Sequence, residues 1–131
     1  MRLALIADLH ANREAFSAVL AHAATQRAER HAFLGDYVGY GADPGWVVDR
    51  IREHVAAGAI AVRGNHDAAV VAGPQPSMIA DARAIVAWTR ERVDPAQLAF
   101  LTALPLKQVE GDILFVHANA WAPADWAYLD G

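Results

Sequence analysis

The chain has no cysteine among its 131 residues. Disulfide bridges, thiolate zinc sites and cysteine nucleophiles are therefore excluded together. The chain also has no run of lysine and arginine, and its formal net charge is −4. A non-specific nucleic-acid-binding face is not expected on a chain of this charge pattern.

Long hydrophobic runs are also missing. The apolar stretch at residues 2–7 is too short for a secretory signal, and no segment reaches the length of a transmembrane helix. Hydrophobic residues make up 55% of the chain and charged residues 20%, which is typical of a folded domain with a real core. We therefore expect a single domain over residues 1–131, in a soluble cytoplasmic protein with no membrane partner.

Short apolar runs predict five strands. Residues 2–7, 31–34 and 59–63 are continuous apolar runs that end at polar residues or glycine, which is typical of buried strands. Residues 105–110 and 112–116 flank a glycine and predict an antiparallel hairpin.

Helix-start signals lie between these runs. Asn12, Asp43, Ser77 and Asp94 each precede a segment with helical spacing of apolar residues, and proline follows Asp43 and Asp94 directly. The predicted order is therefore βαβαβααββ. This order predicts an α/β fold with a mixed sheet.

Polar side chains follow four of the predicted strands at the point where each strand ends. They are Asp8, His10, Asp36, Asn65, His66, Asp67 and His117. Ligands of open α/β sheets bind outside the carboxyl ends of the strands. We therefore expect these side chains to share one rim of the molecule.

The residue types suit metal ions. Asp8 and His10 are two residues apart and can point the same way, and carboxylate with imidazole is a normal ligand set for manganese, iron or zinc. Asp36 has two oxygens and can bridge two ions, and Asn65 offers a neutral oxygen. Two such ions can clamp a phosphate and generate a hydroxide between them. They would also supply the positive charge that an acidic phosphate-handling chain needs.

Two residues are left for proton chemistry. A protonated His66 beside the metals can give a proton to the leaving alkoxide, and Asp67 can orient that imidazole through a hydrogen bond. A plainer interpretation exists for some of the others. Gly35 and Gly64 are also ordinary turn glycines, and His117 is also a common polar end to a strand.

The polar blocks resemble those of the calcineurin-like metallophosphoesterases. Their pattern is D-x-H, then G-D, then G-N-H-[DE], then a lone histidine, then G-H-x-H, and the first four blocks occur here as Asp8-Leu9-His10, Gly35-Asp36, Gly64-Asn65-His66-Asp67 and His117. The resemblance implies an α/β/β/α sandwich that hydrolyses phosphate esters with two divalent ions. It implies one ion held by Asp8, His10 and Asp36, and a second held by Asp36, Asn65 and His117. It also makes His66 the acid or transition-state stabiliser.

Two departures from the family pattern matter. The loop at residues 35–41 lacks the phosphate-binding arginine of the protein phosphatases, and Asp67 stands where they usually have glutamate. Both features favour the bacterial phosphodiesterase-type branch. The G-H-x-H block is missing before Gly131, so we expect a C-terminally truncated domain in which each metal lacks one histidine. We also expect an exposed sheet edge that allows pairing with a second copy.

Other functions stay open at this point. The chain could be a catalytically impaired remnant that binds metal or phosphate, or an interaction module that pairs through its sheet edge. A dinucleotide site at Gly39, Gly41 and Gly45 is disfavoured, because the last glycine comes one residue late and Asp36 would repel a pyrophosphate.

The expected partner is a small phosphorylated substrate, and we expect nucleic acid only as a phosphodiester substrate. Cyclic nucleotides, dinucleoside polyphosphates, phosphoproteins and small phosphodiesters all stay open as substrates, with phosphoproteins the least favoured. We expect the four tryptophans to serve core or rim packing rather than base stacking.

Overall fold

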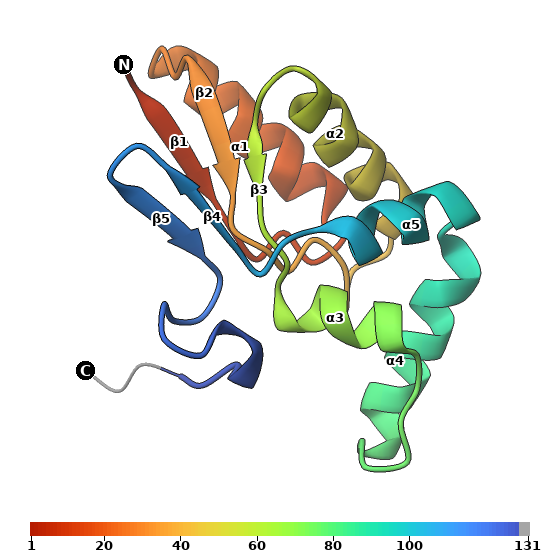
Figure 1. The fold of residues 1–131 in the computed structure, drawn as a ribbon. Coiled ribbons are helices and arrows are strands. Elements are labelled where there is room, and N and C mark those ends of the chain that lie inside the picture. The colour runs from red at the N-terminus through yellow and green to blue at the C-terminus, as the bar shows by residue number, and fades with distance from the viewer. Residues whose placement is uncertain (129–131) are drawn as a thin grey trace.

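A three-stranded parallel sheet forms the centre of the molecule in the computed structural model, which describes residues 1–128 (Figure 1). The strand order is β1-β2-β3. The strands are β1 (Leu3–Ile6), β2 (Arg30–Phe33) and β3 (Ile60–Ala61). Because all three run in the same direction, their carboxyl ends meet at one edge of the sheet.

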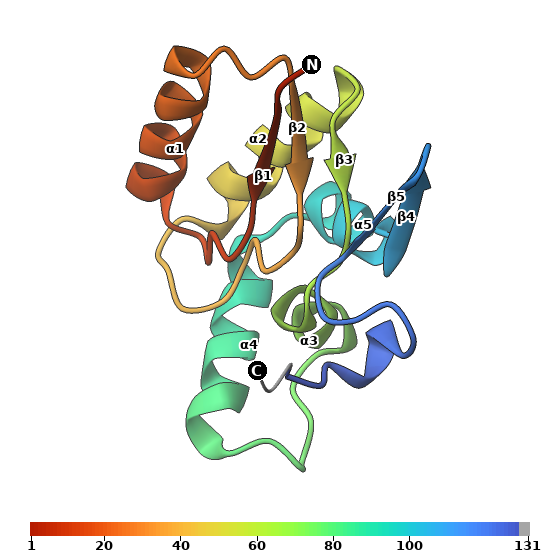
Figure 2. The same ribbon diagram turned by 90° about the vertical axis from the view of Figure 1, so that its left-hand side faces the viewer.

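Two helices cover one face of this sheet, opposite the C-terminal hairpin (Figures 1 and 2). They are α1 (Arg13–Thr25) and α2 (Pro44–Ala56). As predicted, Asn12 caps α1, because its side-chain oxygen accepts the Ala15 N–H at 3.0 Å. Phe16, Phe33 and Ile51 are fully buried between helices and sheet. This packing fixes where each strand ends and therefore where the polar residues begin.

Three helices follow β3, one more than predicted. They are α3 (Asn65–Ala72), α4 (Ala80–Arg92) and α5 (Pro95–Ala103). The predicted start at Asp94 is confirmed by a capping box, in which Asp94 and Gln97 exchange hydrogen bonds of 2.7 and 2.8 Å. The helix predicted from Ser77 begins three residues later, at Ala80.

Helix α3 was not predicted. Its eight residues are mostly alanine and valine without a polar stripe, so the sequence shows no helical periodicity there. The helix begins where the Asp67 carboxylate accepts the Gly64 N–H at 2.9 Å. A side chain in the first turn that satisfies a free N–H is a normal helix-start device. Here this hydrogen bond lies within residues 64–67, which the sequence assigns to the candidate site.

The predicted hairpin is confirmed. Strands β4 (Lys107–Glu110) and β5 (Ile113–Val116) pair antiparallel, and a short 3₁₀ helix, η1 (Pro123–Asp125), follows. Phe115 packs against Ala32, Ile60 and Val62 on the sheet face that the helices leave free. The α/β architecture is therefore as predicted, with parallel pairing in one sheet and antiparallel pairing in the other.

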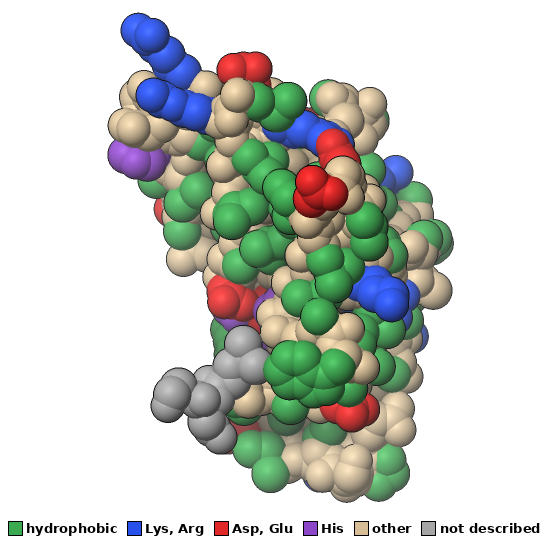
Figure 3. All heavy atoms as spheres, turned by 60° about the vertical axis from the view of Figure 1, so that its left-hand side comes forward, with side chains coloured by type: hydrophobic (Ala, Val, Ile, Leu, Met, Phe, Trp, Pro, Cys, Tyr) green, Lys and Arg blue, Asp and Glu red, His purple; other side chains and the backbone are tan. Residues whose placement is uncertain are grey.

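An apolar groove runs between the parallel sheet and the hairpin, lined by residues of β1 and β5. Leu5 is 62% exposed there and Ile113 52%. Figure 3 shows hydrophobic side chains gathered on this side of the molecule. Within residues 1–128, no helix combines the length and apolar character that a membrane crossing requires.

Candidate functional site

The loops after β1 and β2 run side by side at the carboxyl edge of the sheet. The N–H of Asp8 donates to the Gly35 carbonyl at 3.0 Å, and the N–H of His10 donates to the Asp36 carbonyl at 2.9 Å. Asp8, His10 and Asp36 all have left-handed backbones, with φ of 56°, 47° and 59°. Such backbones are strained for residues other than glycine, and they concentrate at functional sites. Here they direct three polar side chains to one place.

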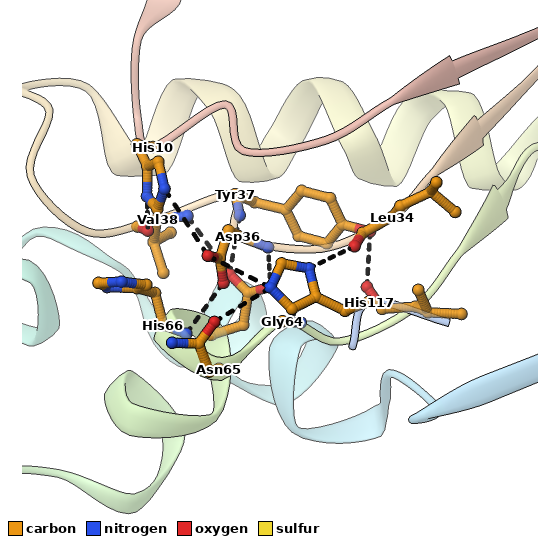
Figure 4. Close-up of polar contacts among 11 residues, drawn as sticks. His10, Leu34, Asp36, Tyr37, Val38, Gly64, Asn65, His66 and His117 are labelled. Atoms are coloured by element: carbon orange, nitrogen blue, oxygen red, sulfur yellow. Dashed lines mark hydrogen bonds and ion pairs between the residues drawn. The ribbon is translucent and has the colours of Figure 1, made fainter. Parts of the chain in front are cut away.

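These side chains and those from two other loops line an open pocket of about 520 Å³ (Figure 4). Six of the seven predicted site residues line it: Asp8, His10, Asp36, Asn65, His66 and His117. The seventh, Asp67, does not. The expectation of a shared rim at the strand ends is therefore met, although His117 arrives from the antiparallel hairpin.

Asp36 is the centre of the site. Its side chain is buried, with one oxygen 3.7 Å from His10 Nε2 and 3.4 Å from His117 Nε2. Burial acts to raise its pKa, but hydrogen bonds from the His117 side chain and the His66 backbone N–H bring the net pKa below 3.8. Asp36 is therefore ionised at neutral pH.

Two sets of possible ligand atoms share the Asp36 carboxylate. One set is His10, Asp36 and His66, and the other is Asp8, Asp36 and His117, each with its atoms within 4.8 Å of one another. The pairing differs from the one implied by the family resemblance, which joins Asp8 with His10. Both schemes make Asp36 the common ligand.

Backbone carbonyls hold two of the histidines in place. His117 Nδ1 lies 2.6 Å from the Leu34 carbonyl, and His10 Nδ1 lies 3.1 Å from the Val38 carbonyl. A carbonyl only accepts, so each Nδ1 carries the proton and donates it. In the neutral rings this leaves Nε2 with its lone pair toward Asp36. Metal-binding histidines are held by hydrogen bonds of this kind.

The donor atoms have the spacing that a divalent ion requires. His117 Nε2 lies 3.0 Å from Asn65 Oδ1 and 3.4 Å from an Asp36 oxygen. Neighbouring ligands on an octahedral ion with bonds of about 2.1 Å are about 3 Å apart. Without a cation or a proton between them, lone pairs at this distance repel. The residues present therefore fit a metal ion.

Either a proton on His117 or a turned Asn65 amide can take the place of that cation. Hydrogen bonding to Asp36 raises the pKa of His117 to about 9, against the opposing effect of burial. When the His117 ring is neutral instead, a turned-over Asn65 amide donates to His117 Nε2 at 3.0 Å and to both Asp36 oxygens at 3.2 Å. Metal binding would therefore displace a proton from His117.

Asp67 has a different position from the one predicted. It is fully buried, and its carboxylate accepts the backbone N–H groups of Asp36, Tyr37, Val38 and Gly64 at 2.8–3.3 Å. Within residues 1–128 it makes no hydrogen bond to the His66 ring. Burial raises its pKa to about 6. Asp67 thus holds the loop that carries Asp36, rather than orienting the imidazole.

Gly64 is more than a turn glycine, because the backbone approaches Asp36 closely there. A Cβ at Gly64 would overlap the Asp36 carboxylate and its backbone nitrogen. Gly35 has a φ of +100°, and a Cβ there would lie 2.7 Å from His117 Nδ1. Both glycines therefore allow the β2 and β3 loops to meet.

His66 is held differently from the other two histidines. Its ring lies 4.8 Å from the rings of His10 and Tyr40, centroid to centroid, and its backbone N–H donates to Asp36 at 3.0 Å. No carbonyl of residues 1–128 accepts from its ring. Burial lowers its pKa below 6.5, partly offset by Asp36. It is therefore mostly neutral at pH 7 and free to contact a bound molecule.

Sequence reasoning missed three aromatic residues of the pocket, Tyr40, Trp126 and Tyr128. The Trp126 ring lies 6.0 Å from the ring of His117. Tyr40 lies between two glycines of the loop after β2. This position could have marked it as a site residue, because an aromatic side chain in a glycine-rich loop rarely belongs to the core. Trp126 follows an irregular stretch with no periodic pattern to place it.

The chain is similar to an uncharacterized protein of Methanocaldococcus jannaschii, with 36% identity over 97% of this chain and 53% of the relative. Among solved structures it is similar to a metallophosphoesterase from Sphaerobacter thermophilus, with a TM-score of 0.83 and 35% identity. That match covers 98% of this chain and 51% of the other. A hypothetical protein of Pyrococcus horikoshii shares the fold, with a TM-score of 0.71 and 21% identity over 82% of this chain and 49% of its own.

The chain thus spans about half the length of the relatives it matches. The family model that it matches covers residues 1–130, which include every strand-end block described above, and is that of the calcineurin-like phosphoesterases. The strand-end carboxylates and imidazoles, the fold and this match agree, and the chain belongs to the calcineurin-like phosphoesterase family.

Proposed function

We propose that this protein hydrolyses phosphate esters, as a phosphodiesterase or phosphatase, with two divalent ions held around Asp36. The supporting observation is the pair of tethered histidines. His10 and His117 each donate Nδ1–H to a backbone carbonyl and direct Nε2 to the same carboxylate. If these histidines were only polar residues at strand ends, both rings would not need to be fixed in this orientation.

The proposed ligands are Asp8, His10, Asp36, Asn65 and His117. Manganese, iron and zinc all suit this mixture of carboxylate, imidazole and amide oxygen. When bound, the two ions would neutralise the phosphate and supply an activated water as nucleophile. Asp36 would be a ligand of both ions, and the Asp67 carboxylate holds it in place by accepting the backbone N–H groups of Asp36 and Tyr37.

His66 is the proposed catalytic residue for the leaving group. Its ring lines the pocket beside His10 without a backbone tether. A phosphate nearby would raise its pKa again and let it hold the proton that the departing oxygen needs. Asp67 is a positioning residue for this step, because it acts only through the loop it holds.

The test is hydrolysis of bis-(p-nitrophenyl) phosphate and p-nitrophenyl phosphate by the purified protein with manganese, beside the Asp36→Asn variant. We expect turnover by the wild type and a loss of at least a hundredfold in the variant. If both proteins bind manganese but turn over neither ester above the no-protein rate, the catalytic proposal is wrong. The alternative of a metal-binding remnant would then hold.

A second candidate role is self-association through the free edge of the hairpin. β5 hydrogen-bonds only to β4 within the described residues, and Ile113 and Leu114 are 52% and 40% exposed. Exposed apolar edges of this kind invite strand pairing with another chain. Light scattering after size exclusion tests this role, and a monomer at every concentration would contradict it.

Three further parts of the proposal concern the whole chain. We propose that residues 1–131 form one domain, that the protein is cytoplasmic, and that it belongs to the phosphodiesterase-type branch of the family.

A further inference from the structure

Three surface pockets meet at Tyr40. The residue lines the metal pocket, a second pocket that includes Glu14 and Asp43, and a third that includes Ile85 and Trp88. Its side chain is 68% exposed, and its φ is +68°, a strained backbone for a residue with a Cβ. This backbone conformation accompanies an aromatic side chain that lines all three pockets.

The third pocket differs from the other two in chemistry. The loop before α2 contributes Tyr40, Gly41 and Ala42, and α4 contributes Ala84, Ile85 and Trp88. Among residues 1–128, no charged side chain lines it. Its volume of about 360 Å³ falls within the range of about 300–1,000 Å³ typical of small-molecule pockets.

Trp88 gives this pocket an aromatic wall that is still accessible. Its side chain is 36% exposed, and the Arg92 guanidinium lies 3.8 Å from the ring centroid. Arginine over an indole ring holds the ring in place by a cation–π contact. Two accessible aromatic residues, Tyr40 and Trp88, therefore contribute to one apolar pocket, and Tyr40 also lines the pocket of the candidate metal ligands.

We propose that this pocket binds a planar aromatic ring in the organic part of the substrate, such as a nucleobase or an aryl group. The inference rests on the proposed function, since the phosphate of the same molecule would lie at the metal site. The second pocket is less suitable for a ring, because the Glu14 and Asp43 carboxylates favour a polar or cationic group. Trp88 would then be a specificity residue rather than the packing residue expected from sequence.

The test compares ligands that share a phosphate and differ in the ring. Manganese-loaded protein is titrated with adenosine 5′-monophosphate and with ribose 5-phosphate, which lacks the base. We expect the nucleotide to bind about tenfold more tightly, within the range that stacking of one base provides. Phenyl phosphate against methyl phosphate forms the second pair and shows whether an aryl group close to phosphorus is enough.

Variants assign the preference to the pocket. Trp88→Ala should bring the ratio of the two affinities, nucleotide over ribose 5-phosphate, to about one without weakening the binding of ribose 5-phosphate. Trp88→Phe should keep most of this ratio. Ile85→Ala, in the same pocket, should lower it in part. Trp121→Ala is the matched control, because Trp121 is 77% exposed and lines none of the three pockets. This control should keep the wild-type ratio.

Equal affinities within both ligand pairs would overturn the inference, as would a ratio that survives in Trp88→Ala. Failure to bind any of the four phosphates would overturn it too. Because this experiment measures binding, its result is independent of whether the protein hydrolyses any ester. A ring preference that depends on Trp88, in a protein that hydrolyses no ester, would support the ring pocket while contradicting the proposed hydrolysis.

Discussion

The carboxyl edge of the parallel sheet and the groove beside the hairpin are built in opposite ways. At the edge, hydrogen bonds fix several polar groups: Asp67 accepts four backbone N–H groups, and carbonyls hold His10 and His117. In the groove, Leu5 and Ile113 are more than half exposed, and the residues that line it are all apolar. We therefore expect substitutions at the carboxyl edge to change stability and metal binding much more than substitutions in the groove.

The largest expected effect comes from the buried carboxylate. Asp67→Ala leaves four buried N–H groups without their acceptor, and each such group is worth about 1–3 kcal/mol. We therefore expect a fall of at least about 3 kcal/mol in the free energy of unfolding by the same reckoning, measured by urea denaturation. Asp81→Ala, at an exposed position in α4, is the control and should change little. Equal stability of the two variants would show that the network does not hold the loop.

A smaller change to the same region should damage the site more than the fold. Gly64→Ala places a Cβ against the Asp36 carboxylate and should weaken manganese binding at least tenfold by isothermal titration. Gly111→Ala is the control for metal affinity, because nothing lies within 4 Å of a Cβ there and the strain from its φ of +59° falls on the β4–β5 turn. Unchanged affinity in Gly64→Ala would mean that Asp36 does not bind metal from this position.

The pH dependence of the metal-free protein tests the His117–Asp36 pair. The pKa of His117 is raised from 6.5 to about 9 in the folded protein. Its stabilising effect is therefore complete below pH 6.5 and is lost as the pH rises through 9. With chelator present, the melting temperature should fall between pH 6.5 and 9, and less so in His117→Asn. A flat wild-type profile would exclude this ion pair.

The smallest effects are expected in the groove. Ile113→Thr removes exposed apolar surface, so it should change the free energy of unfolding by less than about 0.5 kcal/mol, as exposed substitutions usually do, and leave manganese affinity unchanged. It should also reduce any self-association seen by light scattering. A large loss of metal affinity in Ile113→Thr would show that the two regions are coupled.

The sequence was informative where local signals act alone. Asn12 and Asp94 cap helices in the way their position predicts, and the hairpin forms around the predicted glycine turn. Five of the site residues, Asp8, His10, Asp36, Asn65 and His66, line one pocket because parallel strands bring their carboxyl ends together. His117 reaches the same pocket from the antiparallel hairpin.

Long-range contacts were beyond prediction. Asp67 bonds to a loop about thirty residues away, and no local pattern distinguishes that from a bond to the adjacent His66. The Ile85–Trp88 pocket likewise depends on how α4 packs beside the β2 loop. Helix α3 was missed because its composition lacks periodicity, although its first residues were recognised as chemically important.

The most direct test of the shared carboxylate is the number of ions per chain. Manganese-loaded wild type and Asp36→Asn are compared by metal analysis and by electron paramagnetic resonance. We predict two ions per wild-type chain with a spin-coupled spectrum, and in Asp36→Asn fewer ions with the spectrum of isolated manganese. Two uncoupled ions in the wild type, or the same coupled pair in Asp36→Asn, would contradict the central claim that Asp36 joins two metals.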